Sequence, residues 1–543
     1  MDESALVAST SDEAENVMLK DLNQALSRIH SYEEIRLFIA GTPNFGHQAS
    51  SVNLLLRLSW DYAYAGLITV VYDPGNPRNG WTVPKLRRLL HRHIDPAVSE
   101  SLPQRLHLAR LQWFSDEEFA ARTSERVDFG MTGGAEIGRI YRCSLADMLN
   151  VRTALKMQPF QWPWCRDGID FCTQSNQPPV DLLSDEYLGW RLFHRAYRLP
   201  SVLHHPLKAN CQSKNDAVVQ QLLTVKARVS GTSLSCLYGV RREGVCRVDP
   251  ANLLYVYFLA LFRAFSRRDT TATTNMPHRR ILVVNFDDLW NDAFTRLEAY
   301  VYGQDPLSTS EQPVSLPISG NLSNWIRCIR TPEDLPAAIN WSDEPRPQDS
   351  ASDCQACSVK ILYVQVGFVS PESFVEVLQH ADLPTIFEGQ HTASAVASLG
   401  KPYLKLRDSV INNPSQVLRI PDDTCRHSDV VDRIQAASLN LQLGALREMA
   451  LEESVECVSH LLFECTDPSS PLHIYLNDLE AYYRQRGADK FETLLSAWNK
   501  YGFLKQSAGM KGTHVDITPG GPGKPKLHIE ETRELLFQLG LRN

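Results

Sequence analysis

The chain has 543 residues, with 55 Lys and Arg against 63 Asp and Glu, which gives a formal net charge of −8. Domains usually hold roughly 100–200 residues, so this length predicts two large domains with extensions. The 43% hydrophobic and 22% charged residues are ordinary globular usage and exclude a disordered or fibrous chain. The acidic balance argues against a nucleic-acid partner bound through a broad basic surface.

Apolar runs and cysteines bear on the compartment of the protein. The longest apolar run, residues 253–265, is well short of the roughly 20 residues that span a bilayer. The acidic N-terminus lacks the basic and apolar zones of a secretory signal. The 12 cysteines have irregular spacings, and Cys354 and Cys357 have no second pair at zinc-site spacing. We therefore expect a cytoplasmic protein without a membrane span, a disulfide framework or a metal site.

Strand-length apolar runs alternate with helical patterns twice along the chain, which is typical of βαβ units and parallel sheets. The first series of expected strands comprises residues 35–40, 67–72, 106–111, 127–131 and 154–157. The second series comprises residues 222–227, 280–285, 360–366, 385–387 and 403–406. Proline-rich residues 159–206 and 304–358 are expected as long connections.

The expected fold class is α/β, with two facing Rossmann-like domains that each contain a parallel sheet. A helical C-terminal extension follows them. The expected boundaries are 1–30 for an N-terminal helical extension, 31–205 and 206–430 for the two Rossmann-like domains, and 431–543 for the C-terminal extension.

A glycine-bearing turn follows the first expected strand and precedes a helical pattern. Glycine permits a close approach of the backbone to a ligand, and a helix start presents N–H groups to an anion. The stretch has neither a GxGxxG pattern nor the ending of a Walker loop. A polar turn that only caps the helix is the alternative. We expect a substrate to bind here, at the carboxyl edge of the sheet, through Gly41, Asn44, Phe45, Gly46 and Gln48, beside His47.

A second strand–turn–helix junction contains Glu388, Gly389, Gln390, His391 and Thr392. The glycine gives access to the backbone, and the three residues after it bring hydrogen-bond donors to a helix N-terminus. A diphosphate fits such an environment well. The alternative is an ordinary turn whose polar residues only cap the helix.

The two junctions resemble those of glycosyltransferases of the GT-B fold. A glycine-rich first turn that ends in Gly46-His47, and a late element from Phe387 to Pro402 that closes with Gly-Lys-Pro, carry this likeness. The arrangement covers about residues 34–410. The resemblance implies that the first Rossmann-like domain holds the acceptor and the second holds a nucleotide-sugar, with no further cofactor.

A closer similarity is to the bacterial protein-arginine rhamnosyltransferases. Phe368 with the Val-Ser-Pro after it, Phe374, and Glu388-Gly389 before Gly-Lys-Pro are similar to their donor-binding stretch. In their first turn, Asp-Asn-Phe-Gly-Asp, the two acidic positions correspond to Pro43 and His47 of this chain. The resemblance therefore implies the fold and the donor-site geometry, with Phe368 against the base, and leaves the acceptor open.

The implied function is transfer of a sugar from a nucleotide diphosphate-sugar to a small-molecule or protein acceptor, in a cleft between the domains. We expect an inverting transfer. It would be metal-independent, because a helix dipole and side-chain donors stabilise the leaving diphosphate. The alternatives are a nucleotide-sugar 2-epimerase of the same fold and a non-catalytic nucleotide-sugar binding or scaffold protein.

His47 is the candidate general base, because inverting transfer needs a group that removes the acceptor proton near neutral pH. Asp73, after the second expected strand, is expected to orient the imidazole. Asp128 and Glu136 are competing bases. A histidine that only binds the acceptor or caps the helix is the remaining alternative.

Overall fold

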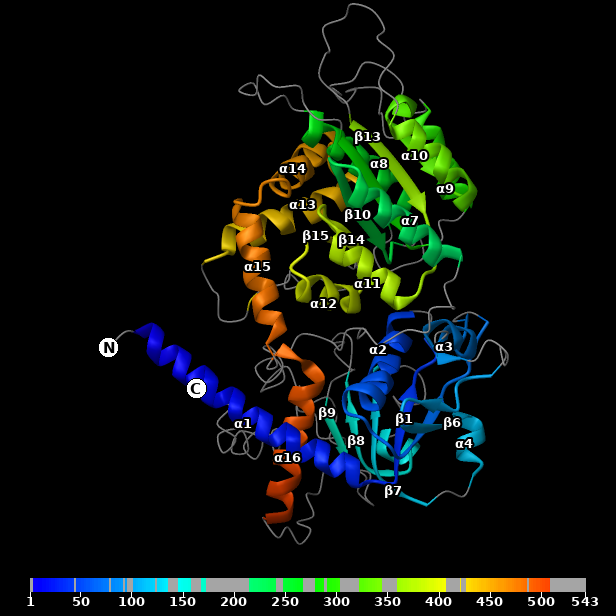
Figure 1. Ribbon diagram of the computed structural model, residues 1–543, viewed down its shortest axis with the longest axis vertical. Coiled ribbons are helices and arrows are strands. Elements are labelled where there is room, and N and C mark those ends of the chain that lie inside the picture. The colour runs from blue at the N-terminus through cyan, green and yellow to red at the C-terminus, as the bar shows by residue number, and fades with distance from the viewer. Residues whose placement is uncertain are drawn as a thin grey trace, which may run out of the picture. The chain divides into compact units, whose positions relative to one another are not determined.

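The computed structural model divides the chain into two compact units (Figure 1). The first unit comprises Met1–Leu207 with Tyr483–Asn543, and the second comprises Lys208–Tyr482. The structure describes residues 3–42, 45–77, 80–90, 93–94, 101–122, 125–134, 145–157, 168–171, 214–240, 248–266, 279–287, 291–302, 322–343, 359–406, 420, 426–485 and 488–507.

The first unit is built on one seven-stranded sheet. Its strands are β1 (Glu34–Ile39), β2 (Leu67–Tyr72), β5 (Arg105–Leu106), β6 (Ala109–Ser115), β7 (Val127–Thr132), β8 (Val151–Lys156) and β9 (Gly168–Phe171). They lie in the order β5-β6-β2-β1-β7-β8-β9, and only β5 and β9, at the edges, pair antiparallel. The chain runs from β1 outward through β2 to β6, and then places β7 on the other side of β1. The carboxyl ends of β1 and β7 therefore form a topological switch point, where open α/β sheets bind ligands.

Helices from both ends of the chain cover this sheet. They are α1 (Glu3–Ser31), α2 (Phe45–Leu56), α3 (Thr82–Leu90), α4 (Asp116–Ala120), α5 (Leu145–Met148) and α16 (Lys490–Ser507). Helix α2 continues as a π-helical turn, η1 (Arg57–Asp61). Helices α1 and α16 lie side by side (Figure 1). The ring of Trp498 in α16 lies 4.7 Å from that of Phe129 in β7. Helix α16, near the C-terminal end of the described chain, therefore belongs to the same hydrophobic core as the first sheet.

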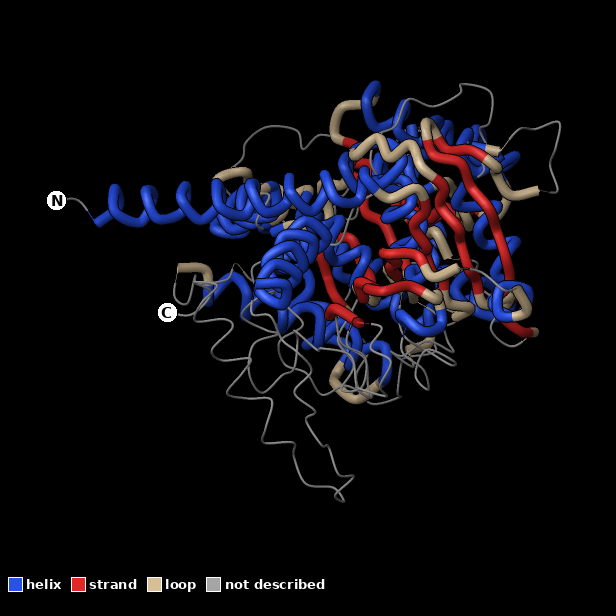
Figure 2. The backbone as a smooth tube through the Cα atoms, turned by 90° about the horizontal axis from the view of Figure 1, so that it is seen from below, coloured by secondary structure: helices blue, strands red, loops and turns tan. Residues whose placement is uncertain are grey.

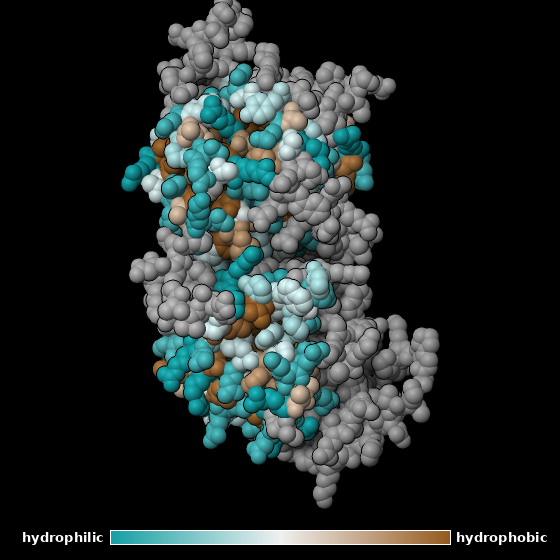
Figure 3. All heavy atoms as spheres, turned by 90° about the vertical axis from the view of Figure 1, so that its right-hand side faces the viewer, coloured by the Kyte–Doolittle hydropathy of each residue, from teal (hydrophilic) through white to brown (hydrophobic). Residues whose placement is uncertain are grey.

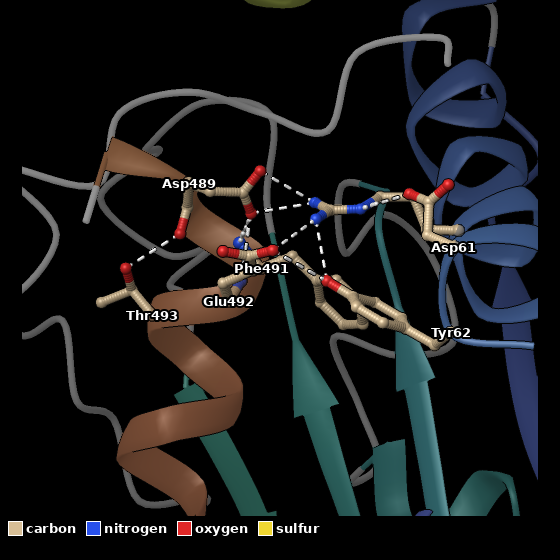
Figure 4. Close-up of polar contacts among 7 residues, drawn as sticks. Asp61, Tyr62, Asp489, Phe491, Glu492 and Thr493 are labelled. Atoms are coloured by element: carbon tan, nitrogen blue, oxygen red, sulfur yellow. Dashed lines mark hydrogen bonds and ion pairs between the residues drawn. The ribbon is translucent and has the colours of Figure 1, made fainter. Parts of the chain in front are cut away.

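A buried ion cluster fixes the start of α16 (Figure 4). The Arg57 guanidinium lies 2.9 Å from the Asp489 carboxylate and 3.2 Å from Glu492 Oε1, and the Tyr62 hydroxyl donates to the same Glu492 oxygen. Burial alone would lower the pKa of Arg57, but the facing carboxylates raise it, so the guanidinium stays charged. Asp489 also caps α16, because its Oδ1 accepts from the backbone N–H groups of Phe491 and Glu492. Residues 432 positions apart are thus joined inside the unit.

The second unit is built on a six-stranded, fully parallel sheet. Its strands are β10 (Thr232–Tyr238), β11 (Arg279–Asn285), β12 (Ile326–Ile329), β13 (Val359–Gln365), β14 (Thr385–Phe387) and β15 (Tyr403–Lys405). The order β12-β13-β11-β10-β14-β15 shows that the chain builds outward from β10 and later crosses to its other side. The switch point of this sheet therefore lies at the carboxyl ends of β10 and β14.

Figure 2 shows the described helices of the chain in blue and its strands in red. Helices pack against the sheet of the second unit. They are α7 (Lys214–Arg228), α8 (Pro250–Ser266), α9 (Asn291–Val301), α10 (Leu335–Asp343), α11 (Pro371–His380), α12 (Gln390–Ser398), α13 (Ser428–Leu446), α14 (Leu451–Glu464) and α15 (Pro471–Arg484). The longest apolar run of the sequence forms α8, whose side chains are buried on every side, as expected for a helix that is hydrophobic all round. In the part of the chain that the structure describes, no helix has both the length and the apolar character that crossing a bilayer requires.

The expected fold class is confirmed: both units are α/β with mostly parallel sheets, and the C-terminal part is helical. Two local expectations are wrong. Residues 222–227 belong to helix α7, where Val218, Val219, Leu222 and Leu223 form one buried stripe at helical spacing, and β10 is the strand that follows. Residues 304–358 contain β12 and α10.

Of two further expected segments, residues 431–543 and 159–206, the first is divided and the second is mostly outside the described residues. Residues 431–543, expected as one extension, divide between the two units after Tyr482. Most of residues 159–206 lie outside the described part of the chain. The exception is β9, residues 168–171.

Candidate functional site

The turn after β1 is closed by its own side chains. Gln48 Nε2 donates to the carbonyl oxygens of Ala40, at 2.7 Å, and Thr42, at 3.2 Å. From α3, Lys85 Nζ donates to the Thr42 carbonyl at 2.6 Å. Gln48 is fully buried, so its side-chain amide stabilises the turn by hydrogen bonds within the protein.

His47 lies in the first turn of α2 with only 3% of its surface exposed. Burial, followed by the charge of Lys85, lowers the pKa of His47 to about 4. The imidazole is therefore neutral at pH 7. It is able to accept a proton, although a histidine of this pKa is a weaker base than one that titrates near neutrality.

Asp73, after β2, lies against the same turn. Its Oδ1 accepts a hydrogen bond from Gly75 N at 2.8 Å, and a Cβ atom on Gly41 would lie 2.7 Å from that oxygen. Position 41 must therefore be glycine to admit the carboxylate. Asp73 and His47 are both described, and no hydrogen bond joins them. Asp73 thus holds the turn and does not orient the imidazole in this structure.

Two glycines that the sequence analysis does not single out follow β7 at the same switch point. Gly133 N donates to Ser51 Oγ at 3.3 Å, and a Cβ atom on Gly134 would lie 3.3 Å from the His47 carbonyl oxygen. The turn after β7 therefore packs directly on the first turns of α2 and helps to bury His47. Adjacent glycines after an expected strand are the signal that marks this turn.

The junction after β14 is open. Gly389 is the N-cap of α12 and supplies no side-chain hydrogen bond to the helix. A Cβ atom on Gly389 would meet none of the described atoms within 4 Å. Across the switch point, Gly239 after β10 has φ of +84°, and its Cβ position lies 3.6 Å from that of Glu388. The two turns therefore meet at the start of α12, where no described atom lies within 4 Å of the Cβ position of Gly389.

The expected donor-binding residues gather at or near this junction. Thr392, the third residue of α12, is 1% exposed. His391 is half-buried, and burial lowers its pKa to about 4, so the imidazole is neutral at pH 7. Gln390 is the first residue of α12, and Glu388 is half-buried. Phe368 belongs to the loop after β13, where its carbonyl accepts from Asn215 Nδ2 at 2.7 Å.

Aromatic side chains and one carboxylate that the sequence analysis did not assign to this site surround the same sheet edge. The Phe374 ring of α11 lies 5.0 Å from the rings of both Tyr238 and Phe286, which follow or end β10 and β11. Asp287 Oδ2 accepts from Val240 N at 3.0 Å and thereby fixes the turn after β10. Their shared signal is position, because each lies at the carboxyl end of a strand or on a helix that follows one.

Some expected site residues fall outside the described part of the chain. Asn44 and Glu136 lie there, and Phe45 is described only through its backbone in α2. Asp128 is exposed and forms an ion pair with Arg152 at 3.1 Å. Among the described residues, no group of three His, Cys, Asp or Glu side chains is placed to hold a metal ion.

Neither a protein-family model nor a curated protein matches the chain. One solved structure that matches it is of EarP, in work on the structural basis for EarP-mediated arginine glycosylation of translation elongation factor EF-P. The likeness covers 71% of this chain and 100% of that chain, with 13% sequence identity and a TM-score of 0.23. Values this low carry no inference about function, so the candidate site rests on its own geometry.

Proposed function

We propose that the chain is a glycosyltransferase that uses a nucleotide diphosphate-sugar as its donor. The observation that carries this proposal is the open start of α12. There a helix N-terminus without a side-chain cap lies at the switch point of a parallel sheet, and a Cβ atom on Gly389 would meet no described atom within 4 Å. A helix N-terminus favours an anion through its N–H groups and its dipole.

The diphosphate is proposed to lie at the start of α12. Gln390, His391 and Thr392 are its proposed partners, because neutral donors stabilise the charge that develops on a leaving diphosphate. Glu388 would accept hydrogen bonds from sugar or ribose hydroxyls, since a carboxylate repels a phosphate. Phe368 is proposed to contact the base.

The acceptor, a small molecule or a protein, is proposed to bind the first unit near the turn after β1. In an inverting transfer its hydroxyl or amide attacks the anomeric carbon, the bond from that carbon to the diphosphate oxygen breaks, and the nucleoside diphosphate leaves with the electron pair. His47 is the proposed base that receives the acceptor proton, and its neutral form at pH 7 is the form that this role requires. No metal ion takes part in this scheme.

Gly389→Asp tests the donor site with little risk to the fold. Aspartate is a preferred N-cap residue, the backbone at Gly389 is extended with φ of −76°, and the Cβ position is unobstructed, so α12 should keep or gain stability. The added carboxylate would repel a diphosphate. In titrations against UDP-, GDP- and dTDP-sugars, we expect the wild type to bind one donor and Gly389→Asp to bind it at least about tenfold more weakly. Gly389→Ser, which adds a cap without a charge, is the matched control.

The same panel separates the other functions. Appearance of the C2 epimer of a bound nucleotide-sugar, without transfer, would identify an epimerase. Donor binding without turnover in the presence of candidate acceptors would favour a non-catalytic binding protein. If the wild type binds none of the donors, the proposal is wrong.

A further inference from the structure

An open groove of about 930 Å³ follows β6, near the edge of the first sheet. Apolar and aromatic side chains from β2, α3 and β6 line it, together with two arginines from the β5–β6 hairpin. Leu111 and Trp113 on one face of β6, and Phe114 on the other, are among the lining residues, with Arg105 and Arg110. On the first unit, Figure 3 shows brown apolar side chains exposed between teal polar ones on the side of the molecule where β6 lies in Figure 1.

Strand β6 presents the backbone of one residue, Trp113, to this groove, because Ser115 N is bonded to the Glu118 carboxylate and Leu111 N to the Gln104 carbonyl. The Trp113 indole donates to the Pro103 carbonyl at 2.7 Å. Strand β2 covers its inner side along residues 110–115, but β5 covers its outer side only at Arg110 and Ala109. Leu111 N donates outward to the Gln104 carbonyl, and backbone groups alternate along a strand, so the N–H and C=O of Trp113 also point outward. Neither of these two groups has a partner among the described residues. Such an edge is a template for pairing with another strand.

The same hairpin carries a charge that the fold does not compensate. Arg105 and Arg110 stand directly opposite each other in the antiparallel pairing of β5 with β6. Both are exposed, and no carboxylate of the described part of the chain forms an ion pair with either. Like charges in directly opposed positions destabilise a strand pair. An anionic partner would remove this repulsion.

We propose that this groove binds an extended acidic segment of a partner protein, which adds a strand beside β6. Its backbone pairs with Trp113, its carboxylates face Arg105 and Arg110, and its apolar side chains lie on the opposite face of the added strand, where they pack on Trp113. Strand addition takes its affinity from main-chain hydrogen bonds and its specificity from alternate side chains. This surface belongs to the first unit, whereas the proposed donor site belongs to the second.

The test uses a fluorescein-labelled octapeptide of alternating valine and glutamate, titrated into the full chain by fluorescence polarisation. Two control peptides isolate the two parts of the proposal. One has lysine in place of glutamate, and the other is N-methylated at alternate residues and cannot complete a backbone ladder. We expect each to bind at least about tenfold more weakly than the valine–glutamate peptide. Hydrogen exchange should show that the peptide protects the amide of Trp113.

Charge reversal checks the arginines. Arg105→Glu and Arg110→Glu should each weaken peptide binding at least about tenfold, whereas Arg228→Glu, on the exposed end of α7, should leave it unchanged. Each hairpin variant creates an opposite-charge pair, so an unchanged or higher melting temperature would show that it folds. The proposal is overturned if the peptide does not bind, if the lysine peptide binds equally well, or if the arginine variants retain full affinity. Stronger binding of a thymidine oligonucleotide than of the peptide would also overturn it, by assigning the groove to a phosphate backbone.

Discussion

The switch points of the two sheets share one plan, a strand, a glycine-bearing turn and a helix, but they differ in what fills the turn. After β1, Gln48, Lys85 and Asp73 fill it with protein groups. After β14, the turn ends at Gly389, beside space that no described atom occupies. A glycine in such a turn can therefore be required for either of two physical reasons. Gly41 admits a neighbouring side chain of the same chain, whereas Gly389 leaves room that a ligand can take.

The largest expected effect concerns chemistry at the closed turn. His47→Gln removes the proposed base and should lower the rate of sugar transfer about 10²–10⁴-fold, while donor affinity stays at the wild-type value. Single-turnover kinetics with a donor identified by titration would measure this loss. His391→Gln, at the open turn, is the contrasting variant and should change donor binding. Wild-type transfer rates in His47→Gln would shift the role of base to a carboxylate such as Asp128 or Glu136.

The buried histidine also predicts how stability depends on pH. Its pKa falls from 6.5 in the unfolded chain to about 4 in the folded one, so the unfolded state binds the proton more readily. Above pH 6.5 the imidazole is neutral in both states and the free energy of unfolding is at its full value. As the pH falls from 6.5 toward 4, protonation of the unfolded chain lowers the free energy of unfolding by about 3 kcal/mol in total. Denaturant unfolding of wild type and His47→Gln across this range should show a shallower pH dependence in the variant. Parallel curves would mean that the imidazole reaches solvent.

A matched pair of alanine substitutions tests the two glycines directly. In Gly41→Ala the new methyl group would lie 2.7 Å from Asp73 and 2.9 Å from Gly75 N, so we expect a loss of about 1–3 kcal/mol in stability. Gly389→Ala places its methyl group in open space and should change stability by no more than about 0.5 kcal/mol. Chemical denaturation measures both. Equal losses would contradict the distinction between a filled turn and an open one.

The smallest effect is expected at Thr392. Thr392→Ala removes one hydrogen bond to the diphosphate and should weaken donor binding by about 1–2 kcal/mol. Isothermal titration with the same donor gives this difference. Thr392→Ser, which keeps the hydroxyl, should bind nearly as well as the wild type. Unchanged affinity in the alanine variant would remove Thr392 from the donor site.

The sequence predicted those parts of the fold that depend on local pattern. Strands β1 and β2 are long apolar runs with turn residues after them, and both were predicted at nearly their observed bounds. Strand β10 was missed because it contains Ser233 and Ser235. The Ser235 hydroxyl is satisfied by the Pro384 carbonyl at 2.7 Å, 149 positions away, so its burial depends on a contact that no local window contains.

The sequence predicted where the two βα turns of the candidate site lie, but not the surroundings of the side chains in them. Both βα turns were identified because glycines and polar residues follow expected strands. The lowered pKa of His47 was not predictable, since it depends on the charge of Lys85 in α3 and on burial to which the turn with Gly134, after β7, contributes. The role of Asp73 likewise follows from its contact with Gly41, which exists only once β1 and β2 are paired.

The ion cluster around Arg57 has a consequence for how the protein is made. Asp489 follows Arg57 by 432 residues, and at about 5–20 residues per second a ribosome needs roughly 20–90 s to synthesise that interval. During this time the first sheet lacks α16 and the guanidinium lacks two of its carboxylates. The second unit, Lys208–Tyr482, emerges completely within the same interval. We therefore expect the unit that begins first to finish last, and a nascent chain stalled before Lys490 to expose the apolar surface that Phe491 and Trp498 later cover.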